Sequence, residues 1–170
     1  MTRKRFITIV LILVFFQIIL NLSLSVSTFV MFAPLCFVIL GLKRGTSSVK
    51  CMIVAFTLGL IVDGLSSGIP GLWSAALVAA SIPRLIIIRR RSWEDDYDYY
   101  DMPSPMDMGR GAFFLCSLAV SLVFIITYVL LEKMMVVLIW TDIVRMAVSV
   151  FVNAVCVYLI AVFVQDKKKR

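Results

Sequence analysis

The chain has 170 residues, of which 62% are hydrophobic, and a mean hydropathy of +1.03, whereas soluble domains are about 45–50% apolar. A soluble domain of this size leaves too much surface exposed to hide such an apolar content, so lipid is the solvent for most of the chain. The net charge of +7 would suggest nucleic acid in a soluble protein, but basic residues in membrane proteins sort by side, and we expect no nucleic-acid partner.

Six apolar segments approach the length of about 20 residues that a membrane-spanning helix needs. The first follows a basic start and also resembles a secretory signal, but its apolar stretch exceeds the usual range of roughly 7–15 residues, which favours a retained span. The second contains Pro34, and both the second and the third are short enough to be tilted or only partly inserted. The six segments are residues 6–26, 28–42, 49–65, 71–88, 112–131 and 143–164. They predict an all-α integral membrane protein, a six-helix transmembrane bundle that forms a single polytopic domain over residues 1–170.

Lysine and arginine are sorted between the two sides of this predicted bundle. Of the 17 basic residues, 14 fall before the first span, in the linkers 43–50 and 89–111, or after the last span. Only Lys133 falls in the opposite linkers. Cytoplasmic loops carry the excess of lysine and arginine, which places both termini and the loop 89–111 in the cytoplasm. This orientation requires an even number of spans.

The cytoplasmic loop 89–111 has a charge pattern of its own. Its three arginines, residues 89–91, are topology anchors. The stretch 94–101 that follows holds five acidic residues and three tyrosines. It is either a solvated linker or a docking patch for a cytoplasmic partner, and we favour the linker.

Small residues recur at helical spacing in two of the predicted spans. Such residues let two helix backbones approach closely in lipid, so we expect contacts between helices there, although alanine and glycine are also simply frequent in such helices. The fourth span carries Gly71, Ala75 and Ala79, with Ala76 and Ala80 beside them, and the sixth carries Ala147, Ala154 and Ala161.

Few polar residues interrupt the spans. Gln17 and Asn21 lie four apart on one face of the first span, and Asn153 is in the middle of the sixth. Buried amides of this kind hydrogen-bond across helices, and a substrate pocket is the alternative. Arg84, near the cytoplasmic end of the fourth span, is expected to extend to the headgroups.

Asp63 and Arg145 are opposite charges that we expect at a similar depth near the outer face. Paired, each lowers the cost of holding the other near lipid; alternatively, each reaches the outer water separately. Asp63 precedes a turn marked by Gly64, Gly68, Pro70 and Gly71. Glycine supplies backbone angles barred to other residues, and Asp63 can accept backbone N–H bonds from this turn.

The chain has no pattern typical of an enzyme. Histidine, the commonest general base and metal ligand, is absent. The four cysteines are far apart in apolar runs and predict no disulfide framework. No paired carboxylates suggest acid–base catalysis. We predict no catalytic residue, metal or cofactor.

The block FTLGLIVDGLSSGIPGLWSAALVAA, residues 56–80, resembles the rod shape-determining MreD family. That family has a glycine, an aspartate at the end of the third span, a short turn, and a second glycine opening a small-residue helix. Gly59, Asp63 and Gly71 match this order. The early FFQIILN and the fifth-span ending ITYVLLEK, with Glu132, are also similar, and the long loop before the fifth span resembles Bacteroidetes-like versions. The resemblance covers nearly the full length.

The resemblance implies a non-enzymatic, multi-pass subunit of the bacterial elongasome in the inner membrane, which supports rod shape and lateral peptidoglycan synthesis. Such a subunit associates with the bitopic protein MreC, and through it with MreB, RodA and a class B penicillin-binding protein. Its fold is expected to be similar to the substrate-binding S-component of energy-coupling-factor transporters. The alternative function is a small-molecule-binding subunit of such a transporter, for which Gln17, Asn21, Asp63, Arg145 and Asn153 would line a cavity.

Overall fold

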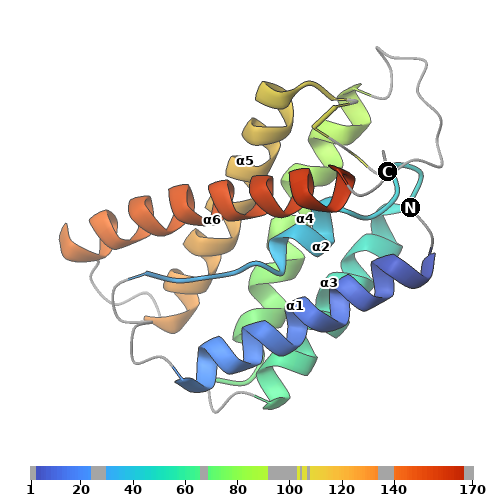
Figure 1. Ribbon diagram of the computed structural model, residues 1–170. Coiled ribbons are helices and arrows are strands. Elements are labelled where there is room, and N and C mark those ends of the chain that lie inside the picture. The colour runs from blue at the N-terminus through green and yellow to red at the C-terminus, as the bar shows by residue number, and fades with distance from the viewer. Residues whose placement is uncertain are drawn as a thin grey trace.

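The computed structural model describes residues 3–23, 30–65, 69–91, 103, 105–106, 108–133 and 140–166. These ranges contain six helices and no strand, which confirms the predicted all-α class for the described part of the chain. The helices are α1 (Arg3–Ser23), α2 (Cys36–Leu40), α3 (Ser48–Leu65), α4 (Leu72–Arg91), α5 (Arg110–Glu132) and α6 (Trp140–Asp166), shown in Figure 1. The acidic, tyrosine-rich stretch 94–101 lies outside the described residues.

Five helices coincide with predicted segments, each beginning and ending within three residues of the expected position. The exception is the segment 28–42, whose prediction as a membrane-spanning helix is wrong. Residues 30–33 have no regular secondary structure, Pro34 and Leu35 form a turn, and the helix that follows, α2, has five residues. Such a helix is about 7–8 Å long, far short of a hydrocarbon core of roughly 30 Å. Proline explains the break, because it has no N–H and disfavours helical geometry in the residue before it.

We call residues 30–42 the crossing segment, because in Figure 1 they run across the molecule between α1 and α6. Residues 33–41 are all buried, and α2 contacts α3, α4, α5 and α6. Around this centre, α4 packs most extensively on α5 and α3, and α5 packs on α6. Non-helical backbone at membrane depth is tolerated where protein covers it, and the surrounding helices provide that cover.

The outside of the molecule is apolar as well. Phe15, Leu115 and Phe163 are 66%, 65% and 73% exposed. Within the described residues, α3, α5 and Trp140–Val164 of α6 are long and apolar enough to cross a membrane, while the apolar stretches of α1 and α4 are shorter. Exposed apolar surface of this extent marks contact with a membrane or another protein. The chain therefore has the character of a membrane protein.

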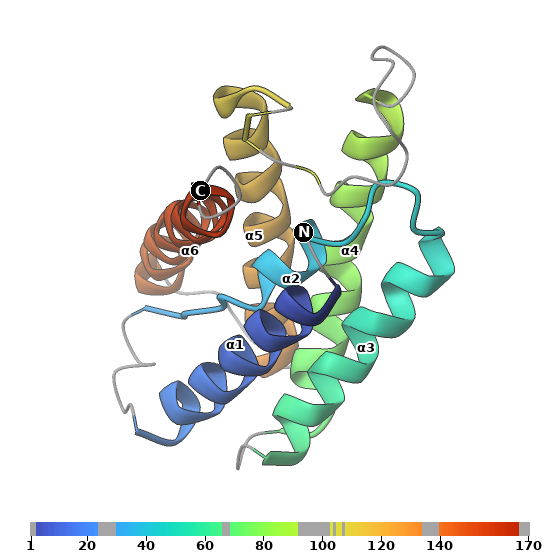
Figure 2. The same cartoon turned by 45° about the vertical axis from the view of Figure 1, so that its right-hand side comes forward.

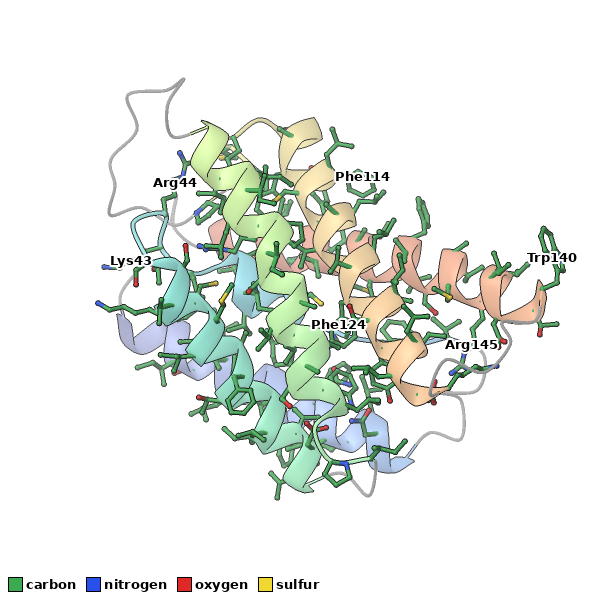
Figure 3. The ribbon with its side chains drawn as sticks, turned by 180° about the vertical axis from the view of Figure 1, so that it is seen from behind. Lys43, Arg44, Phe114, Phe124, Trp140 and Arg145 are labelled. Carbon is green, nitrogen blue, oxygen red and sulfur yellow. The ribbon has the colours of Figure 1, made fainter. Side chains whose placement is uncertain are left out.

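The helix ends gather on two sides of the molecule. In Figure 1 the starts of α1, α3 and α5 and the ends of α4 and α6 lie toward the top and right, and the other ends lie toward the bottom and left. Figure 3 shows Lys43 and Arg44 at the side opposite to Trp140 and Arg145. The start of α1 and the end of α6 thus share a side, as in a chain that crosses the molecule an even number of times.

Candidate functional site

Asp63 closes the junction between α3 and α4. Its side chain is 8% exposed; Oδ1 accepts the N–H of Trp73 at 3.0 Å, and Oδ2 accepts the N–H of Ser74 at 3.1 Å. These N–H groups belong to the first turn of α4, where a helix offers them no internal partner. A carboxylate also suits the positive end of the helix dipole. Asp63 thus accepts backbone N–H bonds, as expected, but the expected donors in the preceding turn are wrong, because both donors belong to α4.

Gly59, one turn before Asp63 on α3, brings the two helices into direct backbone contact. A Cβ built on Gly59 would lie 2.2 Å from the Cα of Ser74 and 2.5 Å from its backbone nitrogen. No side chain fits there unless the helices separate. Of the three glycines predicted in the turn, only Gly71 is found there: Gly64 lies inside α3, so its prediction is wrong, and Gly68 lies outside the described residues. A Cβ would meet nothing within 4 Å at either Gly64 or Gly71, but Gly71 has φ +89°, a left-handed angle that favours glycine.

An aromatic cluster extends this junction to α5. The Trp73 ring lies 5.3 Å from Phe124 and 5.5 Å from Tyr128, the latter edge-on, and Phe124 and Tyr128 are 6.0 Å apart. Aromatic pairs in such tilted or edge-to-face arrangements add about 0.5–1.5 kcal/mol beyond their buried area. The hydrogen bonds from the start of α4 to Asp63, which cap this helix, therefore also fix the Trp73 ring against α5.

Charged side chains from three helices lie within electrostatic range of Tyr128. Asp63, Glu132 and Arg145 all act on it electrostatically, so they gather at one end of the molecule. The predicted Asp63–Arg145 ion pair stays a prediction. It is compatible with the cap, because each carboxylate oxygen can accept a second hydrogen bond. Nearby, Lys133 and Asp142 form an ion pair that joins the end of α5 to the start of α6.

Two of the three predicted amides, Gln17 and Asn153, bind the crossing segment, and the third, Asn21, binds Gln17. From α1, Gln17 Nε2 donates to the Phe32 carbonyl at 3.0 Å and to Asn21 Oδ1 at 3.2 Å, as the shared face predicts. From α6, Asn153 Oδ1 accepts the Ala33 N–H at 2.6 Å, and Asn153 Nδ2 donates to the Met31 carbonyl. Gln17 and Asn153 therefore bind non-helical backbone, and the predicted hydrogen bonds between amides of different helices are not what these two side chains make.

Ser149 completes this set and was not predicted. Its Oγ accepts the Met31 N–H at 3.0 Å, and its own carbonyl accepts a hydrogen bond from Asn153 Nδ2 at 2.8 Å. Two sequence signals existed. Ser149 lies four residues before Asn153, on the same face of a helix, and Pro34 marks a segment whose backbone needs partners outside a helix.

The prediction for Arg84 is wrong. The side chain is fully buried, and Nη2 donates to the carbonyls of Leu42 at 2.7 Å and Lys43 at 3.1 Å. Nη1 contacts the Cys51 sulfur at 3.6 Å. The end of the crossing segment presents carbonyl oxygens that only an internal donor can satisfy, and this requirement holds the guanidinium inside instead of at the headgroups.

The small-residue stripes are buried only in part. In α4, Ala76 and Ala80 are fully buried while Ala75 is exposed, so the buried face lies one residue beyond the predicted one. In α6, Ala154 and Ala161 are buried and Ala147 is exposed.

The described residues contain no group of three or more cysteine, aspartate or glutamate side chains that could hold a metal ion. The four cysteines, all among the described residues, form no disulfide with one another. No family model, curated protein or solved structure matches the chain. The resemblance to the MreD family therefore rests on the residues of the chain alone.

Proposed function

We propose that this chain is a non-enzymatic membrane subunit of the bacterial elongasome, similar to MreD. It supports rod shape and lateral peptidoglycan synthesis by associating with an MreC-like bitopic protein, and through it with MreB, RodA and a class B penicillin-binding protein. The observation that supports this proposal is the α3–α4 junction. Gly59, Asp63 and Gly71 carry the resemblance, and each meets a separate requirement of that junction: close backbone approach, helix capping and a positive φ.

The proposed topology has six crossings of the inner membrane, with both termini and the loop 89–111 in the cytoplasm. Five crossings are helices, and the sixth is the crossing segment. The sorting of lysine and arginine supports this orientation. We propose a bundle similar to the S-component of energy-coupling-factor transporters, with its second element mostly non-helical.

The polar groups inside the bundle favour a scaffold over a transport subunit. Asp63 binds two backbone amides of α4, and Asn153 binds the backbone of the crossing segment. Groups used in this way stabilise one arrangement of the helices rather than recognise a substrate. A rigid body with an apolar exterior suits a subunit that holds other membrane proteins in place.

Co-purification from native membranes tests the proposal. A tagged chain should recover an MreC-like bitopic protein, and Asp63→Ala should lower that recovery severalfold relative to Gly64→Ala, which changes the same helix without a clash. Retained folding of both variants, measured by thermal unfolding in detergent, separates partner loss from misfolding. Recovery of no cell-wall synthesis protein from the native membrane would contradict the assignment.

The second candidate is the small-molecule-binding subunit of an energy-coupling-factor-type transporter. One observation favours it: a buried, non-helical segment at the centre of the bundle, lined by side-chain amides. Interrupted membrane segments are where transporters place their binding sites. In the same co-purification, recovery of an ATPase module with a coupling subunit would select this candidate.

A further inference from the structure

Gln17 has a buried carbonyl oxygen with no hydrogen-bond partner. The side chain is completely buried, and its Nε2 is committed to the Phe32 carbonyl and to Asn21, but Oε1 accepts no hydrogen bond. Rotating the amide by 180° would place Oε1 against the Phe32 carbonyl oxygen, so the observed orientation is the favourable one. Buried acceptors without a hydrogen bond are rare in native proteins, and a bound water or ion is one common source of the donor.

The backbone N–H and C=O groups of residues 31–33 have different hydrogen-bond partners on the two sides of this stretch. On the α6 side, Ser149 and Asn153 together bind the Met31 N–H, the Met31 carbonyl and the Ala33 N–H. On the α1 side, Gln17 makes one hydrogen bond to the stretch and keeps one free acceptor. The unsatisfied acceptor therefore lies between α1 and the crossing segment.

This location is close to the C-terminal end of α1. Gln17 lies six residues before the end of α1 at Ser23, which is about 9 Å at a rise of about 1.5 Å per residue. Asn21 lies on the same face, between Gln17 and that end, and is partly exposed. Leu13 and Val14, one turn deeper, are buried and apolar. Asn21 is therefore the polar side chain between Gln17 and the described end of α1, and buried apolar side chains lie on the other side of Gln17.

We propose that the seam between α1 and residues 31–33 binds a small molecule or headgroup that donates an N–H or O–H hydrogen to Gln17 Oε1. Two sources supply this chemistry. One is water entering from the outer end of α1, and the other is the hydroxyl or amine of an amphiphile dissolved in the bilayer. The inference does not depend on the elongasome assignment, because it follows from the hydrogen bonds of Gln17 alone.

Nuclear magnetic resonance of the unaltered chain tests the site. The sequence has two glutamines, Gln17 and Gln165, so labelling glutamine side-chain amides with nitrogen-15 gives two pairs of signals, which a Gln17→Asn variant assigns. In nanodiscs of phosphatidylethanolamine and phosphatidylglycerol, the Gln17 amide protons should show a cross-peak to a donor. A cross-peak to water identifies the aqueous source, and one to lipid headgroup protons identifies the bilayer source. No cross-peak to either would overturn the proposal.

Thiol labelling gives an independent measurement. In a chain whose four native cysteines are replaced by alanine, Gln17→Cys and Asn21→Cys should react with a charged thiosulfonate at least about 10-fold faster than Val14→Cys if the source is water. If the source is the bilayer, only a lipophilic maleimide should show this preference over Val14→Cys. Equal rates for Gln17→Cys and Val14→Cys with both reagents would count against the seam. Phe16→Cys, on the exposed apolar face of α1, is the control for reaction from lipid.

Discussion

At Gly59 the backbones of α3 and α4 are so close that one added methyl group would collide with the helix opposite, 2.2 Å from the Ser74 Cα. Overpacking of this kind costs about 1–3 kcal/mol, and the obstacle here is backbone, which cannot rotate away. We expect Gly59→Ala to lower the free energy of unfolding by about 3 kcal/mol, measured by denaturant titration in detergent micelles.

Gly64 is the matched control, because it lies on the same helix with open space where its Cβ would be. Alanine is favoured over glycine inside a helix by about 0.5–1 kcal/mol, so Gly64→Ala should be neutral or slightly stabilising. Gly59→Ala should therefore lower the free energy of unfolding, whereas Gly64→Ala should leave it unchanged or raise it slightly. Equal stability of both would mean that the close approach at Gly59 is not a constraint on the fold.

Asp63 should be required for the start of α4. Asp63→Ala leaves the N–H groups of Trp73 and Ser74 without their acceptors, and loss of a cap costs about 0.5–2 kcal/mol. Asp63→Asn keeps one oxygen acceptor but loses the charge that the helix dipole favours, so its cost should be intermediate. Hydrogen exchange of the first turn of α4 measures the effect directly. Unchanged protection in Asp63→Ala would contradict the capping role.

A double-mutant cycle decides whether Asp63 also pairs with Arg145. If the ion pair exists, Asp63→Ala and Arg145→Ala should be less than additive, with a coupling of about 0.5 kcal/mol or more in unfolding free energy. A coupling of zero would rule out the ion pair. It would not affect the capping role of Asp63, because the hydrogen bonds to the backbone N–H groups of α4 do not involve Arg145.

Predictions about single residues succeeded where the hydrogen-bond partners lie close in the sequence. The aspartate before a glycine-rich turn indicated a carboxylate bound to backbone N–H groups, and that is what Asp63 does. Arg84 could not be predicted in the same way. Its partners are the carbonyls of Leu42 and Lys43, about forty residues earlier, and they need a donor only because the crossing segment ends beside α4. Nothing in the neighbouring sequence signals such a demand.

At the scale of secondary-structure elements, hydrophobic length predicted five helices and failed for the crossing segment. Residues 28–42 are as apolar as their neighbours, but Pro34 interrupts the helix, and the broken backbone must find partners elsewhere. Gln17, Ser149 and Asn153 provide them. An apolar run therefore predicted the location of this element correctly and its conformation incorrectly, because hydropathy measures the surroundings of a segment and not its backbone hydrogen bonds.

The crossing segment should depend on Asn153 more than on any other side chain that binds it. Asn153→Ala leaves the Ala33 N–H and the Met31 carbonyl unsatisfied in the interior, at a cost of about 2 kcal/mol after partial relaxation. Ser149→Ala removes one acceptor and should cost less than half as much. Hydrogen exchange of the peptide covering residues 30–35 should rise much more in Asn153→Ala. Equal effects of the two variants would show that the segment is held by packing rather than by the amide.

At the scale of the whole molecule, the order of helix contacts follows the chain: α3 packs on α4, α4 on α5, and α5 on α6. Short linkers make the α3–α4 and α5–α6 contacts predictable, whereas α4 packs on α5 although a long loop joins them. The central place of α2 and the peripheral place of α1, visible in Figure 2, were not predictable, because both depend on the break at Pro34. Once the second element is thin and mostly non-helical, the other helices can close around it.

The proposed orientation predicts the outcome of cysteine labelling in whole cells. In a cysteine-free chain, single cysteines at positions 2, 45, 98 and 168 should react with a membrane-impermeant maleimide only after permeabilisation, because lysine and arginine hold these segments in the cytoplasm. Cysteines at positions 27, 67 and 137 should react in intact cells. The decisive comparison is between positions 27 and 45, which flank the crossing segment. If both react from the same side, that segment enters and leaves the membrane on one face, the number of crossings becomes odd, and the two termini must lie on opposite sides of the bilayer.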